Sequence, residues 1–303
     1  MTELHRPAIT EPSAVPTIIK DLPPLNFEAF AKQKEYIKVN EELVKKMTVL
    51  LPKTFWWVDV ATGTGMVPKL LTEEAKRTGR KGIIIGVDPN TTSLEIARKT
   101  TKPSEDVSVE FIEGFGKDLK LLLQGKISEG GIDGASILDA IHEIPEEAEK
   151  KQVLASMADV LNPGGILAVN SAFTTYGMEP SPMGWGRWKS KAFKNLGKVQ
   201  NKNINAIKLH TPDEYRQMLE ESRLAVISEA KKIVNLSHEA LVAISHYPEF
   251  INGVFRDMID QDKFSLEEKR DALVKALEGV PFLPRGWWEL IAQKPSPQTA
   301  SLA

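Results

Sequence analysis

Cysteine is absent from the 303 residues of this sequence. Its absence excludes disulfides, zinc–thiolate sites, iron–sulfur clusters and a cysteine nucleophile. The sequence also lacks a run of 18 apolar residues and so predicts no transmembrane helix. Residues 1–25 have no apolar stretch of signal-peptide length and contain five prolines, which predicts a loose leader and a cytoplasmic location.

A strong charge of either sign is absent as well. The formal net charge is −2, so the whole molecule has no strong electrostatic attraction to nucleic acid or to a membrane. Hydrophobic residues make up 42% of the chain and charged residues 26%, which is typical of a soluble globular protein. The length predicts one large domain or a domain with an insertion.

Strands and helices alternate between residues 54 and 172. The continuous apolar run "GIIIGVD" is typical of a parallel strand covered on both faces. The segment "PEEAEKKQVLASMADVL" has proline and acids in its first turn, which favours a helix start. Five such alternations predict a parallel, doubly wound α/β sheet. Residues 27–50 have apolar residues at helical spacing and predict N-terminal helices.

A tight turn follows the first predicted strand, in "WWVDVATGTGMVP". The turn matches neither the G-x-G-x-x-G dinucleotide fingerprint nor a phosphate-binding loop ending in Gly-Lys-Ser/Thr. Asp59, at the end of the strand, disfavours a phosphate nearby and favours a cation such as an amine or a sulfonium. Small residues in the turn allow close approach of a ligand to the backbone.

A second acid, Asp88, ends the next strand and lies 23 residues after Gly65. This spacing is close to the ~20 residues expected for an acid that binds ribose hydroxyls. The ligand therefore has a ribose, lacks an essential phosphate and has a positive, amino-acid-like end. S-adenosylmethionine has these features, and its product would be S-adenosylhomocysteine.

These residues resemble the class I S-adenosylmethionine-dependent methyltransferases, in particular the small-molecule group that includes quinone-biosynthesis C-methyltransferases. The resemblance covers about residues 54–172, and "LNPGG" at 161–165 resembles the family's turn before strand 5. The late segment "WWELIAQKP" resembles its seventh, antiparallel strand. The implied fold is a Rossmann-like, doubly wound seven-stranded sheet with helices on both faces, N-terminal helices and a late helical cap.

The resemblance also implies a set of cofactor-binding residues. The family's loop after strand 1 reads D/E-x-G-x-G-x-G, and Ala61 here replaces the first glycine, which suggests a slightly wider turn. The loop after strand 3 usually carries an acid that touches adenine; here Gly114-Phe115-Gly116 stands in its place, with backbone groups or Asp118 as substitutes. The full expected set is Tyr36, Asp59, Ala61, Thr62, Gly63, Thr64, Gly65, Asp88, Pro89, Asn90, Gly114, Phe115, Gly116 and Asp139.

The end of the fourth predicted strand, "LDAIHEIPE", supplies the candidate catalytic residues. His142 is a candidate general base and Asp139 a second candidate, and the alternative for His142 is that it caps the helix starting near Pro145 or packs on the surface. Metal-dependent catechol methyltransferases carry an Asp-Asn pair after strand 5. Because this chain has Asn170-Ser171 there, we expect no metal site.

The parts outside the common core are expected to select the acceptor. We divide the chain into a leader at 1–25, N-terminal helices and cofactor core at 26–172, a basic aromatic lid at 173–210, a core helix and strand at 211–236, a helical cap at 237–282, and a last strand and tail at 283–303. A cap excludes water and favours a small or lipid-like acceptor.

The expected function is methyl transfer to a small aromatic, quinone-like or lipid-like C or O acceptor. The basic segment at 181–210 leaves other hypotheses open, because it contains seven Lys or Arg and no acid. It could hold an anionic acceptor, contact a membrane peripherally through residues 185–198, or serve an RNA or protein methyltransferase, although we do not expect a nucleic-acid partner. A solvated lid helix, or a protein that binds S-adenosylmethionine without methylation, also fits. The sequence leaves the oligomeric state open.

Overall fold

A computed structural model describes residues 26–127, 130–178, 182–201 and 209–296. The predicted leader, the end of the tail and parts of the segment 173–210 lie outside these ranges. The seven strands are β1 Thr54–Val60, β2 Lys81–Asp88, β3 Val107–Glu113, β4 Ile132–Leu138, β5 Leu161–Ser171, β6 Ala225–Ser237 and β7 Phe282–Gln293. The α-helices are α1 Glu28–Ala31, α2 Lys34–Leu50, α3 Met66–Thr78, α4 Thr91–Thr100, α5 Leu119–Leu122, α6 Glu147–Val160, α7 Pro182–Asn195, α8 Pro212–Glu221, α9 His238–Ile244, α10 Pro248–Phe255 and α11 Leu266–Ala276.

All seven strands form one sheet in the order β3-β2-β1-β4-β5-β7-β6. The first five are parallel, whereas β7 runs antiparallel to both β5 and β6. The strand order reverses beside β1, which is where open α/β sheets bind ligands beyond the carboxyl ends of their strands. The predicted fold class, including the antiparallel last strand, is confirmed.

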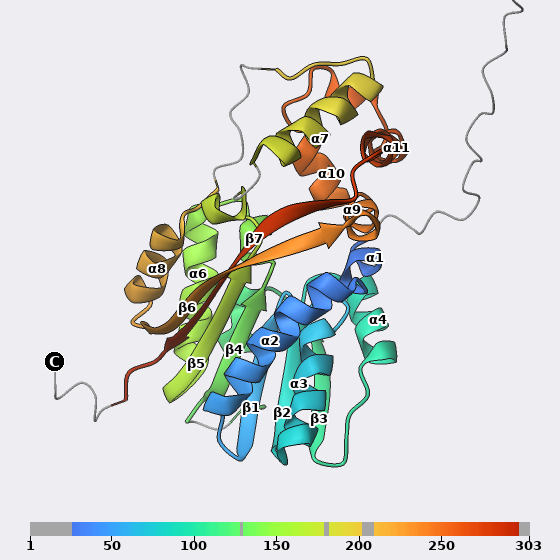
Figure 1. Ribbon diagram of the computed structural model, residues 1–303. Coiled ribbons are helices and arrows are strands. Elements are labelled where there is room, and N and C mark those ends of the chain that lie inside the picture. Colours follow the sequence, from blue (N-terminus) through green and yellow to red (C-terminus); the bar gives the residue numbers. More distant parts are fainter. Residues whose placement is uncertain (1–25, 128–129, 179–181, 202–208, 297–303) are drawn as a thin grey trace, which may run out of the picture.

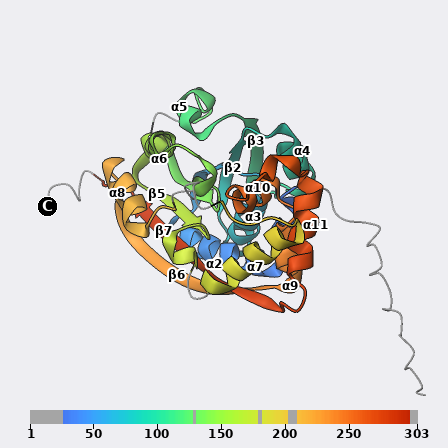
Figure 2. The ribbon, with the colours of Figure 1, turned by 90° about the horizontal axis from the view of Figure 1, so that it is seen from above.

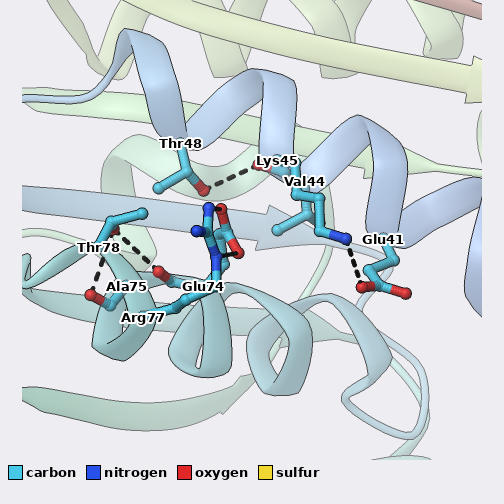
Figure 3. Close-up of polar contacts among 8 residues, drawn as sticks. All are labelled: Glu41, Val44, Lys45, Thr48, Glu74, Ala75, Arg77 and Thr78. Carbon is cyan, nitrogen blue, oxygen red and sulfur yellow. Dashed lines mark hydrogen bonds and ion pairs between the residues drawn. The ribbon is translucent and has the colours of Figure 1, made fainter.

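Helices cover both faces of the sheet (Figures 1 and 2). One apolar cluster joins α5, α6 and α8 to one face, and a second joins α2 and α3 to the other. Figure 3 shows that the side-chain contacts drawn on α2 and α3 stay within each helix, as in the bond from Thr48 Oγ1 to the carbonyl of Val44 at 2.8 Å. Apolar side chains of both helices, including Leu43, Met47 and Leu71, belong to one buried cluster.

The β6–β7 hairpin extends past the end of β5. Pairing between β5 and β7 stops at Ser171 and Trp288, while pairing between β6 and β7 continues to Ser237 and Phe282. Helices α9, α10 and α11 lie between the two strands in sequence and gather with α7 above this hairpin (Figure 1). We call α7 and α9–α11 the cap. A third apolar cluster joins the cap to α1, α2 and Trp287 of β7.

The first part of the predicted helical cap at 237–282, "SHEALVAISHYPEFINGVFRDMI", forms two helices, α9 and α10. The break falls at Tyr247, the residue before Pro248, and its backbone is extended with φ −88° and ψ 116°. Proline disfavours the helical conformation in the residue before it, so it ends one helix and begins the next.

Candidate functional site

The loops after β1, β2 and β3 meet at the carboxyl edge of the sheet. The backbone N–H of Thr62 donates to the carbonyl of Val87 at 3.1 Å, and that of Gly114 donates to the carbonyl of Asp88 at 3.1 Å. The N–H of Gly63 donates to Asp88 Oδ2 at 2.8 Å. The structure therefore brings three of the predicted cofactor loops together.

The turn after β1 is built from left-handed backbone. Ala61 has φ +53°, Gly63 φ +53° and Gly65 φ +84°. A Cβ on Gly63 would point into open space, whereas a Cβ on Gly65 would lie 2.7 Å from Thr101 Oγ1. Gly63 thus leaves room beside the turn for a ligand, and Gly65 allows α3 and α4 to pack closely. Ala61 adopts the conformation of the glycine it replaces, at a cost of about 1–2 kcal/mol.

Asp59 lies beneath the turn and is only 1% exposed. Its Oδ1 accepts a hydrogen bond from Ser136 Oγ at 2.6 Å, and Ser136 in turn accepts from the indole N–H of Trp57 at 3.0 Å. Burial raises the pKa of Asp59 to about 7, because desolvation outweighs the hydrogen bond from Ser136. A cationic ligand nearby would favour the ionised form.

Asp88 holds the ends of two loops and still has acceptor capacity for a ligand. Its Oδ1 accepts from the N–H of Asn90 at 2.8 Å, and its Oδ2 from that of Gly63. Burial raises its pKa in spite of these two bonds. Each carboxylate oxygen accepts more than one hydrogen bond, so both remain able to accept a ribose hydroxyl.

The neighbouring residues that were expected near adenine are exposed or engaged in local structure. Pro89 and Asn90 lie at the surface, and Asn90 Oδ1 caps α4 by accepting from the N–H of Ser93 at 3.0 Å. Phe115 is 55% exposed between Gly114 and Gly116. A Cβ on Gly116 would lie 2.5 Å from Val60, so close packing requires glycine there. Their contacts with adenine stay predictions, as does the substitute contact through the exposed Asp118.

Asp139, at the end of β4, has a left-handed φ of +52°. Its N–H donates to Asn170 Oδ1 at 2.7 Å, and its Oδ1 accepts from the N–H of Ala172 at 2.9 Å. Burial raises its pKa to about 7, and the hydrogen bond from Ala172 and the charge of Arg285 offset only part of the rise.

Two buried amides support Asp139: Asn40, which sequence reasoning missed, and Asn170, which it weighed only as a metal ligand. Asn170 Nδ2 donates to Asn40 Oδ1 at 2.8 Å, and Asn40 Nδ2 donates to the carbonyl of Tyr36 at 2.9 Å. Both asparagine side chains are fully buried. The sequence feature that could have indicated this pair is Asn40, a polar residue within the apolar stripe of α2. Its partner lies 130 residues away in the chain, so the pairing itself was not visible in the sequence.

His142 is half-buried and packs against the cap side of the site. Its Nδ1 lies 3.1 Å from Ser171 Oγ, and its ring stacks on Phe173 with centroids 4.3 Å apart. Burial, followed by the charges of Arg285 and Lys150, lowers the pKa of His142 to about 3. Its ring is therefore neutral near pH 7 but weakly basic.

Glu143 connects this loop to the cap. Tyr247 donates its hydroxyl to Glu143 Oε1 at 2.5 Å. Part of the Glu143 side chain reaches solvent, yet desolvation of its carboxyl and the nearby charge of Asp139 raise its pKa to about 7. Tyr247 also packs its ring on Phe27 at 4.9 Å, so the cap meets both the core and the N-terminal helices here.

A small cavity lies between the end of β4, β7 and the cap. Its volume is about 20 Å³, room for roughly one water molecule. Its lining is mostly apolar and aromatic, with one acid and one guanidinium: Phe30, Asp139, Ala172, Phe173, Trp185, Leu236, Ile244, Phe250, Arg285 and Trp287.

Tyr36 lies next to this cavity. Its ring packs edge-on against Trp287 with centroids 6.0 Å apart. Burial, with the charges of Asp139, Glu143 and Asp59, raises its pKa well above the ordinary value. Tyr36 is therefore close enough to Asp139, Glu143 and Asp59 to be affected by their charges. Its contact with the cofactor stays a prediction.

The basic lid segment is partly neutralised by the cap itself. Lys189 pairs with Asp257 at 2.6 Å and Lys198 pairs with Asp260 at 2.8 Å. Trp185, Trp188 and Phe193 are buried on the inner face of α7. The outer face holds an open hollow lined by Met183, Gly186, Arg187, Ser190, Lys191 and Lys194.

Within the described ranges, no group of three or more His, Asp or Glu side chains is placed to hold a metal ion. The Asn170 side chain, a candidate ligand by position, is engaged with Asn40 and Asp139. In the same ranges no helix is both long and apolar enough to cross a membrane.

Residues 58–165 match a protein family described as a methyltransferase domain. This range contains the turn after β1, Asp88, the loop at 114–116, Asp139 and His142. No curated protein matches the sequence.

Solved structures share the fold at low sequence identity. The structure of a loganic acid methyltransferase with S-adenosylhomocysteine has a TM-score of 0.54 and 10% identity, covering 89% of this chain and 95% of that one. An S-adenosylmethionine-dependent methyltransferase from Methanosarcina mazei has a TM-score of 0.50 and 12% identity, covering 83% and 97%. The [4+2]-cyclase SpnF has a TM-score of 0.50 and 16% identity, covering 86% and 81%.

Proposed function

We propose that this enzyme, whose residues 58–165 match a methyltransferase domain, transfers a methyl group from S-adenosylmethionine to a small molecule bound beneath the cap. The observation that carries the proposal is the position of Asp139. It follows β4 at the carboxyl edge of the sheet, and it also lines the cavity under the cap. Asp139 thus lies between the loops expected to bind the cofactor and the cavity expected to bind the acceptor.

The residues at this edge fit a ribose-bearing cation. Asp88 offers two carboxylate oxygens beside Gly63, where the backbone faces open space. Nearby carboxyls also raise two of these pKa values: the charge of Asp88 raises the pKa of Asp59, and the charges of Asp139 and Asp88 raise that of Glu143. A cation bound among them would relieve this repulsion. Such a cluster supports a sulfonium with an amino group and opposes a phosphate.

S-adenosylmethionine supplies a methyl group on a sulfonium, which is already a good leaving group. The protein's main task is therefore to align the acceptor and to exclude water, and alignment contributes about 7–11 kcal/mol to such reactions. The aromatic lining from Phe173, Trp185 and Phe250 supports both tasks, because it is apolar and well packed.

An acceptor that attacks from an O–H or a C–H group must also lose a proton. A base works best when its pKa lies near the working pH. The pKa of Asp139 is about 7 and that of His142 about 3. Since Asp139 also lines the cavity, we assign it the role of proton acceptor, and His142 the role of supporting Phe173 by stacking.

The acceptor class that this cavity supports is a small, largely apolar C or O nucleophile, including aromatic, quinone-like and lipid-like molecules. The pairing of Lys189 and Lys198 with acids of the cap leaves less free positive charge for an RNA or a protein substrate. One protein with this fold is named as a [4+2]-cyclase and not as a methyltransferase. Methyl transfer itself should therefore be tested as well as cofactor binding.

Calorimetry with S-adenosylmethionine and S-adenosylhomocysteine tests the proposal. We expect both to bind with Kd below about 1 mM, and Asp88→Ala to weaken binding at least tenfold through loss of the ribose contacts. Asp271→Ala removes a carboxylate that is exposed on α11 and should leave both affinities unchanged. Absence of binding to the unmodified protein would refute the cofactor assignment, and equal affinity of Asp88→Ala would refute the role of Asp88.

A further inference from the structure

The extended part of β7 places two residues with N–H donor groups in the lining of the cavity. Arg285 and Trp287 are two residues apart on one strand and so share a face, and both line the cavity. They lie beyond the last residue of β7 that pairs with β5, which is Trp288. The β6–β7 hairpin therefore connects to the cap helices α9–α11 and also contains Arg285 and Trp287, which lie beneath the cap.

Arg285 is a buried cation held in a fixed orientation. It is 3% exposed, and its Nε–H donates to the carbonyl of Ala172 at 2.8 Å. The guanidinium lies over the rings of Phe173 at 4.5 Å and Trp185 at 4.6 Å. Burial lowers its pKa to about 10, so it stays charged at pH 7. Its planar fork of N–H groups suits two-point recognition of a carboxylate.

Trp287 adds a second, independent donor. Its side chain is 1% exposed, and its indole N–H has no hydrogen-bond partner among the residues that the structure describes. A buried donor without a partner destabilises the folded protein, because it has lost its hydrogen bonds to water. An oxygen acceptor of a ligand in the cavity would remove that destabilisation.

The rest of the cavity has little to offer a polar ligand. Apart from Asp139, its other lining residues are apolar or aromatic: Phe30, Ala172, Phe173, Trp185, Leu236, Ile244 and Phe250. The raised pKa of Asp139 reduces its negative charge near pH 7, and so reduces its repulsion of an anion.

We propose that the acceptor is an apolar molecule bearing a carboxylate, and that the carboxylate oxygens accept hydrogen bonds from the Arg285 guanidinium and the Trp287 indole N–H. This inference rests on the proposed function, because it names the substrate class of the same site. The simpler role for Arg285, balancing the charge of Asp139, would give no preference for an acid over its amide.

Binding of such a molecule requires movement of the cap. The cavity holds about 20 Å³, whereas sites for small ligands usually measure ~300–1,000 Å³. The cap residues Trp185, Ile244 and Phe250 form one side of it, so displacement of α7, α9 and α10 enlarges the space toward Arg285.

The test compares matched acids and amides on protein saturated with S-adenosylhomocysteine. The probes are trans-cinnamate and octanoate, with cinnamamide and octanamide as their neutral partners, measured by calorimetry. We expect each acid to bind at least tenfold more tightly than its amide. Arg285→Gln should abolish the preference, Arg285→Lys should keep part of it, and Trp287→Phe should weaken acid binding several-fold.

Arg187→Gln is the matched control, because Arg187 is exposed on the outer face of α7. It should keep the acid preference. The proposal is overturned if neither acid binds better than its amide to the unmodified protein, or if Arg285→Gln keeps the preference. If the unmodified protein does not bind S-adenosylhomocysteine, the proposed function is contradicted instead. The two failures are therefore distinguishable.

Discussion

Ala61 holds a backbone conformation that glycine adopts with less strain. Relief of about 1–2 kcal/mol of left-handed strain outweighs the extra chain entropy of glycine, about 0.5–1 kcal/mol. We therefore expect Ala61→Gly to stabilise the fold by about 0.5–1 kcal/mol and to raise Tm by about 1–2 °C. Thermal unfolding followed by circular dichroism measures the change.

Ala75→Gly is the control for this substitution, since Ala75 is buried within α3 with no left-handed backbone to relieve. Glycine costs about 1 kcal/mol at such a position, so Tm should fall. A fall in Tm for Ala61→Gly as well would contradict the strain at Ala61.

Asp59 should make stability depend on pH. Its folded-state pKa of about 7 lies above the ordinary value of about 3.9, so the folded state holds this proton more tightly than the unfolded state. Its contribution is full below about pH 4 and is lost as the pH rises through about 7. Asp59→Asn keeps an acceptor for Ser136, so we expect it to be more stable than the unmodified protein by up to about 4 kcal/mol at pH 8, since each pKa unit corresponds to ~1.4 kcal/mol.

Urea unfolding at pH 5 and pH 8, without cofactor, checks this expectation. The stability difference between Asp59→Asn and the unmodified protein should be smaller at pH 5 than at pH 8. The prediction is wrong if the difference is the same at both values, because a pH-independent change would come from packing and not from the carboxyl.

The contact between Glu143 and Tyr247 joins two elements that are far apart in sequence. Tyr247 lies directly before α10, and Glu143 ends the short helix at Ile141–Glu143 after β4. Tyr247→Phe removes the hydrogen bond but keeps the ring packing on Phe27. We expect local opening of α10 to become about 2- to 10-fold more frequent, which corresponds to ~0.5–1.5 kcal/mol. Hydrogen exchange of residues 248–255 measures it.

Tyr176→Phe serves as the matched control, because Tyr176 is exposed and lies away from α10 in the short helix at Thr175–Met178. It should leave exchange in α10 unchanged. Equal exchange in Tyr247→Phe and the unmodified protein would show that apolar packing alone holds this helix.

Element by element, the sequence predicted periodic segments better than their ends. The first strand, Thr54–Val60, begins at residue 54, where the predicted alternation of strands and helices begins. The last strand begins at Phe282, five residues before the predicted "WWELIAQKP". Those five residues include Pro284 and Gly286 and carry no strand signal of their own; their pairing with β6 makes them a strand.

For the molecule as a whole, the sequence predicted the sheet, the helices on both faces and the late cap. The long apolar runs and their alternation with helices are local patterns, and they admit few topologies. It also identified Asp88 and Asp139 as candidates from their places at strand ends. Their cofactor contacts stay predictions, although the structure brings the loops that carry them to one edge.

What the sequence alone determined is the fold and its expected donor site, because strand ends, turns and small residues are encoded within a few neighbouring positions. Only the tertiary structure decided the rest. It joined Asn40 to Asn170, and it placed Arg285 and Trp287 beneath α7 and α10. Burial then set the pKa values of Asp139 and His142 far from their ordinary ranges. Burial depends on contacts between distant segments, and no local pattern records which segments those will be.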